Sequence, residues 1–192
     1  MNHNGKVFDA RNWRKLESPE RLEKMNPEKL AAAMGLTGAE SVLDLGCGTG
    51  FFAAPVARIC AKLYGVDISP EMLSIFGEKL KNGSSPNVEL LLGNGKTIPL
   101  EDGALDVVFH VNLFHEIDDH KAFHAEITRV LKPGGRLFTV DWRAIETEGG
   151  PPLSHRIPED KAEESLKRDG FSSIRHINIY DSQYVIGAEA SK

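Results

Sequence analysis

The sequence lacks the features of several large classes of protein. Its 192 residues contain no apolar run approaching the roughly 20 residues of a membrane-spanning helix. Residues 1–14 are too polar for a signal peptide. The two cysteines, Cys47 and Cys60, are spaced neither as a metal motif nor as a disulfide framework. We therefore expect reduced thiols, a cytoplasmic location and no membrane span.

An excess of positive charge is also missing. Twenty-three lysines and arginines face 28 acidic residues, which gives a net charge of −5. Such a chain has no general electrostatic attraction for nucleic acid or for an anionic membrane. No G-x-x-x-x-G-K-[ST] phosphate loop is present. The length and the 41% content of hydrophobic residues are typical of one globular α/β domain.

The most informative stretch is residues 42–50, Val-Leu-Asp-Leu-Gly-Cys-Gly-Thr-Gly. Its apolar start predicts a buried strand. The three glycines that follow allow a tight turn against which a ligand can lie. A helix expected over 51–60 would point its free N–H groups at that turn. A dinucleotide fingerprint is disfavoured, because its third small position falls on Phe51.

The rest of the chain alternates between predicted strands and helices. We expect strands at 62–67, 88–92, 104–110, 136–140, 174–180 and 183–188, and helices at 27–34, 70–81, 119–131 and 158–169. Asp67 ends the second strand, 17 residues beyond Gly50, where a carboxylate can accept both hydroxyl groups of a ribose. Ser69 and Pro70 are the expected cap and first residue of the next helix, which leaves Asp67 for a ligand.

Three motifs in this order resemble a known family. The D-x-G-x-G-x-G turn, Asp67, and E-I-T-R-V-L-K-P-G-G at residues 126–135 resemble the class I S-adenosylmethionine-dependent methyltransferases over about residues 36–141. The nearest resemblance is to the small-molecule branch with the ubiquinone and menaquinone methyltransferases. It implies an α/β fold with a Rossmann-like, mostly parallel seven-stranded sheet of order 3-2-1-4-5-7-6, strand 7 antiparallel, and helices on both faces. Residues 36–192 would form this domain, and residues 1–35 a flap and helix belonging to it.

The resemblance implies an enzyme that transfers a methyl group from S-adenosyl-L-methionine to a small molecule. The residues expected at the cofactor are Asp44, Gly46, Cys47, Gly48, Thr49, Gly50, Asp67, Ile68, Met72, Asn94, Gly95 and His110. Asn94 stands where the family often carries an acid that recognises adenine, and an amide can both donate and accept there. Ile68 and Met72 could form apolar walls for the purine, although ordinary helix packing would also explain them.

The methyl acceptor is expected beyond the carboxyl ends of the fourth and fifth strands. The candidate catalytic residues there are His115, Asn112 and Asp141. His115 is the best candidate for a base because histidine titrates near neutrality, and a packing or capping histidine is the alternative. Arg143, His155 and Arg156 together could hold an anionic acceptor.

The cover of the acceptor pocket is left open by the sequence. The loop after Asp141, the N-terminal flap or a second subunit of a homodimer could supply it. In the flap, Val7, Phe8, Trp13 and Leu16 either exclude water from the site or simply pack a surface arm.

Other readings are weaker. His120 and His124 have helical i, i+4 spacing, but the H-E-x-x-H zinc pattern is missing, so we expect no metal and a solvated helix face. Residues 110–113 read His-Val-Asn-Leu rather than the [DN]-P-P-[YF] of methyltransferases acting on nucleic-acid bases. Two alternative functions remain: a non-catalytic S-adenosylmethionine-binding subunit, and a dinucleotide-dependent oxidoreductase.

Overall fold

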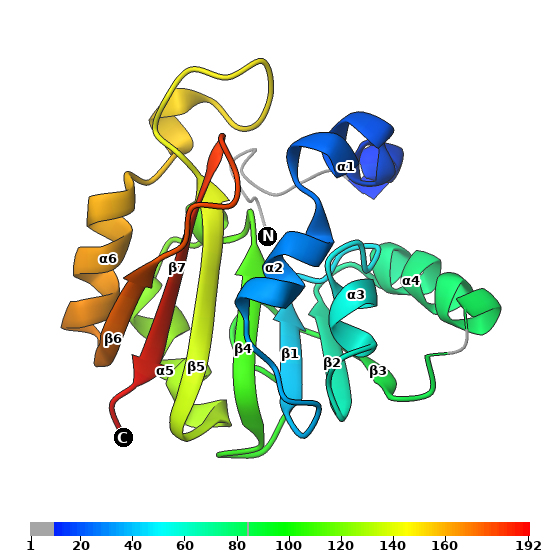
Figure 1. The fold of residues 1–192 in the computed structure, drawn as a ribbon, viewed down its shortest axis with the longest axis horizontal. Helices are drawn as coiled ribbons and strands as arrows, with labels where there is room; N and C mark the ends of the chain where they lie inside the picture. Colours follow the sequence, from blue (N-terminus) through cyan, green and yellow to red (C-terminus); the bar gives the residue numbers. More distant parts are fainter. Residues whose placement is uncertain (1–9, 84) are drawn as a thin grey trace.

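The structure is a computed structural model that describes residues 10–83 and 85–192. One sheet with strand order β3-β2-β1-β4-β5-β7-β6 forms its centre (Figure 1). The strands are β1 Ser41–Leu45, β2 Lys62–Asp67, β3 Val88–Leu92, β4 Leu105–Val111, β5 Leu131–Trp142, β6 Phe171–His176 and β7 Gln183–Ala190. Strand β7 runs antiparallel to β5 and β6, and the other pairs are parallel. The predicted fold class and strand order are confirmed.

The helices begin where polar side chains can cap them. Ser18, Asn26 and Asp119 each accept a backbone N–H of the helix that follows. Ser69 accepts the N–H of Met72 at 3.2 Å, as expected for the cap of α4. The helical elements are η1 Ala10–Glu17, α1 Pro19–Lys24, α2 Pro27–Ala33, α3 Ala53–Ala57, α4 Pro70–Gly83, η2 Phe114–Glu116, α5 His120–Val130, η3 Leu153–His155 and α6 Glu159–Arg168.

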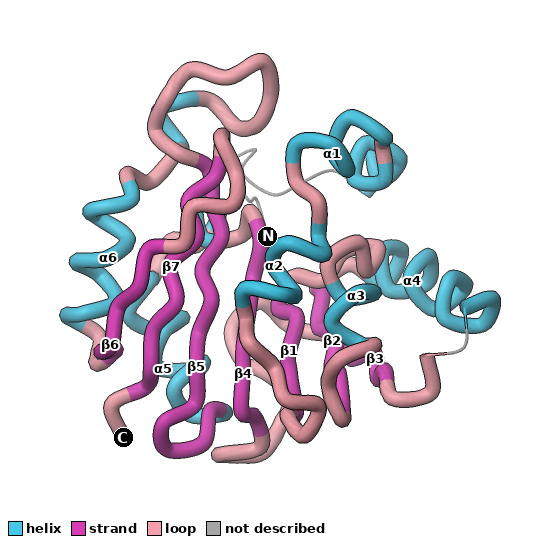
Figure 2. Tube along the Cα trace, viewed as in Figure 1, coloured by secondary structure: helices cyan, strands magenta, loops and turns pink. Residues whose placement is uncertain are grey.

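Both faces of the sheet are covered, because alternate residues of each central strand point to opposite faces. In β1, Val42 packs in a core with α2 and α3, and Leu43 packs in a second core with α5 and α6. Figure 2 shows α2 and α3 in front of the sheet and α5 behind it. Burial on both sides explains why the β1 sequence is a continuous apolar run around Asp44.

Three predicted elements differ from the structure by more than two residues at an end. The helix expected over 51–60 is only α3, at 53–57, in the structure. Pro55 has no N–H to donate, and the N–H groups of Arg58 and Ile59 bond to carbonyls three residues earlier, as in a 3-10 turn, rather than four. Strand β5 begins at Leu131 rather than residue 136, with its register shifted between Leu105 and Val107 of its partner β4. Strand β6 lies at 171–176 rather than 174–180, and beyond it the Tyr180 hydroxyl donates to the Asn26 carbonyl at 2.8 Å.

The N-terminal helices and the 143–158 loop meet beyond the carboxyl ends of the parallel strands. Figure 1 shows α1 and this loop on either side of the space above β1, β4 and β5. Among the described residues, no helix has the length and apolar character needed to cross a membrane. In open α/β sheets this end is where ligands bind.

Candidate active site

A large cleft of about 1700 Å³ opens at this end of the sheet. Its floor is the glycine turn after β1, one side is formed by Asp67 and the segment after β3, and the other by the segments after β4 and β5. Helix α1 and residues 145–152 form its roof. The cleft therefore joins the motifs that the sequence analysis expected to act together.

The glycine turn is fixed by its backbone. The N–H groups of Gly46 and Cys47 donate to the Val66 carbonyl at 2.8 and 3.0 Å, which ties the turn to β2. Gly46, Gly48 and Gly50 all have positive φ. A Cβ on Gly50 would lie 2.3 Å from the Phe76 ring of α4, so this glycine permits helix packing and does not line the cleft. Gly46, Cys47, Gly48 and Thr49 do line it.

Asp67 faces the same cleft from the end of β2. One carboxylate oxygen accepts the Gly48 N–H at 2.8 Å, and the other accepts the Ser69 N–H at 2.9 Å. Partial burial raises the pKa of Asp67 in spite of these bonds. Each oxygen keeps a second lone pair for a ligand hydroxyl.

Asp44 and Arg21 place opposite charges beside the turn. Asp44 is buried, and desolvation followed by repulsion from Asp67 raises its pKa well above the usual value. Arg21 of α1 lies over the rings of Phe51 and Phe52 at 5.0 and 5.4 Å. Desolvation lowers the Arg21 pKa to about 10, although Glu17 and Asp44 oppose the shift. Both Asp44 and Arg21 line the cleft.

The N-terminal segment contacts the glycine turn through Leu16, one of the expected residues, and through Glu17, which was not expected. Glu17 accepts the Thr49 hydroxyl and pairs with Lys79, and Lys79 donates to the Thr49 carbonyl at 3.0 Å. Leu16 lines the cleft beside Gly48, whereas Trp13 does not line it. Val7 and Phe8 lie outside the described residues.

Besides Gly50, two expected cofactor residues, Asn94 and His110, do not line the cleft. The Asn94 amide accepts the N–H groups of Lys96 and Thr97 at 2.9 and 2.8 Å, so it organises its own loop, while Gly95 lines the cleft. His110 is buried behind the wall and contacts Thr139 through Nε2 at 3.1 Å. Burial lowers the His110 pKa to about 3.

Ile68 and Met72 both line the cleft as expected, the first exposed and the second buried. Their side chains leave the end of β2 and the first turn of α4, next to Asp67. The two residues therefore supply apolar surface beside the proposed ribose carboxylate.

His115 and Asp141 form a buried pair. The His115 ring contacts Asp141 through Nδ1 at 2.7 Å, and the His115 backbone N–H donates to the other carboxylate oxygen at 2.9 Å. Asp141 also accepts the Trp142 N–H at 2.7 Å. Because an ionised carboxylate only accepts, Nδ1 is the donor of this pair, and in a neutral imidazole Nε2 is then the acceptor. His115 lines the cleft, while Asp141 does not line it and contacts it through the His115 ring.

Asn112 occupies a rare backbone conformation at the end of β4. Its φ is 54°, and its N–H donates to the Val140 carbonyl at 2.8 Å. The side-chain amide donates to the Met25 sulfur, while the buried Oδ1 has no partner among the described residues. Such an orphaned acceptor in a cleft wall is suited to a ligand N–H or O–H.

The arginines expected to bind an anionic acceptor are engaged within the chain. Arg156 donates to four backbone carbonyls and the Thr147 hydroxyl and lies over the Trp142 ring at 5.0 Å. Arg143 pairs with Glu159 and also contacts Asn178. Neither guanidinium lines the cleft, although His155 does. These arginines shape the 143–158 loop.

The predicted solvated face at His120 and His124 is wrong for His124. That residue is buried, contacts Asp169 through Nδ1 at 2.8 Å and stacks on Phe114 with ring centroids 5.4 Å apart. His120 also stacks on Phe114, with ring centroids 4.1 Å apart. Within the described part of the chain, no group of three potential ligands is arranged to hold a metal.

Helix α1, and with it Arg21, was not predicted from the sequence. The signal was present, because Ser18-Pro19-Glu20 repeats the cap, proline and acid pattern that predicted the next helix at Asn26-Pro27-Glu28. The position of Arg21 over the glycine turn depends on contacts between distant segments. No local pattern gives those contacts.

Comparisons with known proteins agree with this geometry. Residues 43–139 match the family model described as "Methyltransferase domain". A solved structure described as a SAM-dependent methyltransferase from Aquifex aeolicus is 31% identical, with a TM-score of 0.89, and the match covers 95% of this chain and 99% of that one.

Curated relatives match over a shorter region. Demethylmenaquinone methyltransferases from Tropheryma whipplei (strain Twist) and Lactococcus lactis are 38% and 39% identical over 109 residues. These alignments cover 57% and 55% of this chain but only 44% and 43% of the relatives, so the chain spans less than half of their length. The family model, the structural match and the cleft agree: the chain belongs to the class I S-adenosylmethionine-dependent methyltransferases.

Proposed function

We propose that this protein methylates a small molecule that enters the cleft from the side of α1 and the 143–158 loop. The observation that carries the proposal is the shared cleft itself. The glycine turn and Asp67 line one part of it, and His115, held by Asp141, lines another. A site for a methyl donor and a site for an acceptor thus adjoin.

The described residues fit S-adenosylmethionine as the donor. Gly48 brings bare backbone to the floor, and Asp67 offers lone pairs suited to the two ribose hydroxyls. Ile68 and Met72 would contact the purine, together with the backbone at Gly95. When bound, this cofactor supplies a methyl group already activated by a sulfonium, so the protein mainly has to align the partners and exclude water.

Asp44 and Arg21 would hold the amino-acid end of the cofactor. An α-amino acid carries an ammonium and a carboxylate, and the cleft offers one buried acid and one guanidinium beside the glycine turn. Of its N–H donors, the Arg21 side chain spends one on the Leu16 carbonyl at 2.9 Å. A guanidinium with free donors matches a carboxylate in geometry and charge.

On the acceptor side, His115 would act as the base. With Nδ1 held by Asp141, Nε2 can accept a proton from a hydroxyl or amine of the acceptor. The unpartnered Oδ1 of Asn112 would accept a second hydrogen bond and orient that group. Asp141 would hold the ring and stabilise its protonated form.

The acceptor is proposed to be uncharged and largely apolar. The lining of the cleft includes Met25, Trp142, Ile145 and Pro152, and both arginines of the anionic hypothesis are engaged within the chain. The curated relatives are named for demethylmenaquinone, a molecule of that general character. Because α1 and the 143–158 loop roof the pocket, one chain suffices and a homodimer is not required.

The test is a panel of acceptors incubated with S-adenosylmethionine labelled on the methyl group. Neutral phenols and hydroquinones should yield labelled product and S-adenosylhomocysteine, and aliphatic carboxylates should not. Tight binding of the cofactor with no turnover of any acceptor would favour the non-catalytic binding subunit instead. Product from carboxylates alone would contradict the apolar pocket.

A further inference from the structure

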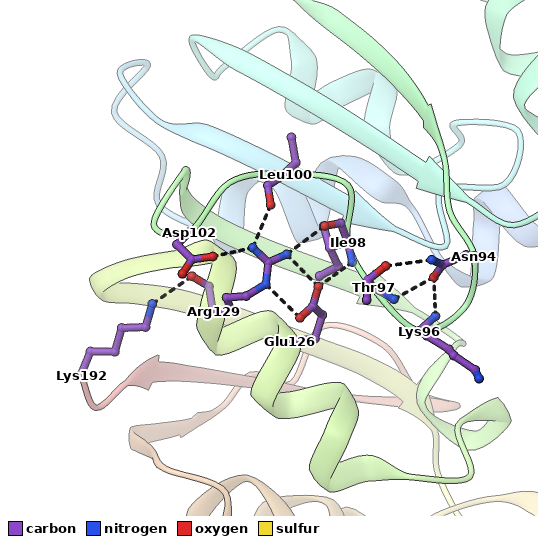
Figure 3. A network of polar contacts seen from close by, with 9 residues as sticks. All are labelled: Asn94, Lys96, Thr97, Ile98, Leu100, Asp102, Glu126, Arg129 and Lys192. Carbon is purple, nitrogen blue, oxygen red and sulfur yellow. Dashed lines mark hydrogen bonds and ion pairs between the residues drawn. The ribbon is translucent and has the colours of Figure 1, made fainter.

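A polar network on α5 fastens the segment that follows β3 (Figure 3). The guanidinium of Arg129 donates to the carbonyls of Leu100 and Ile98, both at 2.9 Å, and to Asp102 at 2.7 Å. Its remaining bonds go to both carboxylate oxygens of Glu126, at 2.9 and 2.7 Å. Every N–H-bearing nitrogen of Arg129 is thus committed.

Glu126 completes the hold on one residue. Its Oε1 accepts the Ile98 N–H at 2.7 Å, while Arg129 binds the Ile98 carbonyl. Both backbone groups of Ile98 are therefore fixed by two side chains one helical turn apart on α5 (Figure 3). The hydrogen bond from Arg129 lowers the pKa of Glu126 and so favours its ionised form. Glu126 and Arg129 are called the clamp below.

The clamped segment is a wall of the cofactor cleft. Gly95, Lys96, Thr97 and Ile98 all line the cleft, and so does Glu126 itself. The segment also adjoins the proposed ribose site, because the Gly93 N–H donates to the Asp67 carbonyl at 2.8 Å. A Cβ at Gly95 would lie 3.7 Å from the Ile68 side chain. The wall next to a ribose carboxylate is where the attached base must lie.

We propose that Glu126 and Arg129 are positioning residues for adenine recognition: they hold the 95–98 segment so that the backbone groups not used within it, those of Gly95 and the carbonyls of Lys96 and Thr97, meet the edge of the purine. This inference rests on the proposed function. The side chain that the sequence analysis expected to read adenine, Asn94, is occupied within its loop, since its amide also donates to Thr97 at 2.8 Å. Recognition then falls to backbone groups, and backbone groups recognise a base only if an outside clamp fixes them.

A purely structural role makes a different prediction. If the clamp only joins α5 to its neighbouring loop, its loss lowers the melting temperature and leaves the choice between purines unchanged. If it sets the position of the wall, its loss weakens binding of the adenine compound more than binding of a compound with an altered purine edge.

The experiment is calorimetric titration of the purified full chain with S-adenosylhomocysteine and with S-inosylhomocysteine, in which an oxygen replaces the exocyclic amine. The variants are Glu126→Gln and Arg129→Gln, with Arg129→Lys as the milder change if Arg129→Gln does not fold. The matched control is Lys161→Gln, which breaks an exposed i, i+3 ion pair with Glu164 on α6.

We expect the Kd for S-adenosylhomocysteine to rise about tenfold in the clamp variants, a change of about 1.4 kcal/mol, and the preference over the inosine compound to fall by a similar factor. The control should bind like the unaltered chain. Unchanged preference in folded clamp variants overturns this inference alone. No binding of S-adenosylhomocysteine by the unaltered chain overturns the proposed function with it.

Discussion

The carboxylate of Asp67 accepts the backbone N–H of Gly48 at 2.8 Å. This bond joins the end of β2 to the glycine turn after β1, so that each positions the other. A ligand that lies on the bare turn therefore meets the carboxylate without rearrangement of either strand. Preorganisation of this kind lowers the entropic cost of binding a ligand.

Substitution of Gly50 in the glycine turn is predicted to destabilise the protein. Gly50→Ala adds a methyl group 2.3 Å from the Phe76 ring, and the φ of residue 50 is 80°. The cost of overpacking and the cost of backbone strain therefore both lower the stability. We expect a loss of about 2–5 kcal/mol in urea unfolding. The matched control is Gly35→Ala, where φ is 58° and no atom lies within 4 Å; it should cost about 1–2 kcal/mol. Equal losses at the two positions would refute the close packing against Phe76.

Asp44 is predicted to reduce the stability of the free protein. Because burial raises its pKa in the folded state, ionisation opposes folding, and the penalty grows as the pH rises from the pKa of an unfolded aspartate, about 4, to that raised pKa. Asp44→Asn should therefore melt higher than the unaltered chain at pH 8, by about 2–4 °C for each kcal/mol regained, and the difference should shrink toward pH 4. It should also bind S-adenosylhomocysteine more weakly. A difference in melting temperature that is the same at both pH values would exclude this origin.

His110 is predicted to make the protein sensitive to acid. Burial lowers its pKa to about 3, against the opposing influence of Asp141 and with the help of His124 and His120. In the unfolded chain, a histidine binds this proton at about pH 6.5. As the pH falls from that value toward the folded pKa, the free energy of unfolding therefore decreases by about 1.4 kcal/mol for each pH unit. His110→Gln should flatten this part of the stability curve, measured by urea unfolding from pH 7 to pH 4. A curve parallel to that of the unaltered chain would show that other groups cause the loss.

The His115–Asp141 pair is predicted to act on turnover rather than on cofactor binding. His115→Ala removes the proposed base and should lower kcat by about 10²–10⁴-fold, while Asp141→Asn should act in the same direction by disturbing the ring. The Kd for S-adenosylhomocysteine should stay within about twofold in His115→Ala, a difference of about 0.4 kcal/mol. Full turnover in His115→Ala, measured with any accepted substrate, would remove the histidine from the mechanism.

Much of the fold could be predicted because local patterns and burial agree. Strands β2 and β3 have the predicted bounds, since each apolar run ends at a polar or glycine residue. The end of α3 could not be predicted in this way, because the pattern around Pro55 continues beyond the point where the hydrogen bonds fail. Its apolar residues are buried whether or not they are helical.

The floor of the site was predictable, and its surroundings were less so. Gly48 and Asp67 face the cleft as expected because strand ends in a parallel sheet share one edge. His110 was predicted to contact the cofactor, but it points to the face of β4 away from the cleft. Its neighbour Val111 lines the cleft instead, because adjacent residues of a strand point to opposite faces. The engagement of Arg156 by its own loop, and of Asn94 by its own turn, depends on loop geometry that residue type does not reveal.

The central claim is that the turn at Gly48 and the carboxylate of Asp67 form one site for an adenosyl cofactor. A crystal structure of the chain with S-adenosylhomocysteine tests it most directly. The account predicts ribose hydroxyls within hydrogen-bonding distance of Asp67, the amino-acid end near Asp44 and Arg21, and the purine against residues 95–98. A ligand bound elsewhere, or a ribose with no contact to Asp67, would contradict it.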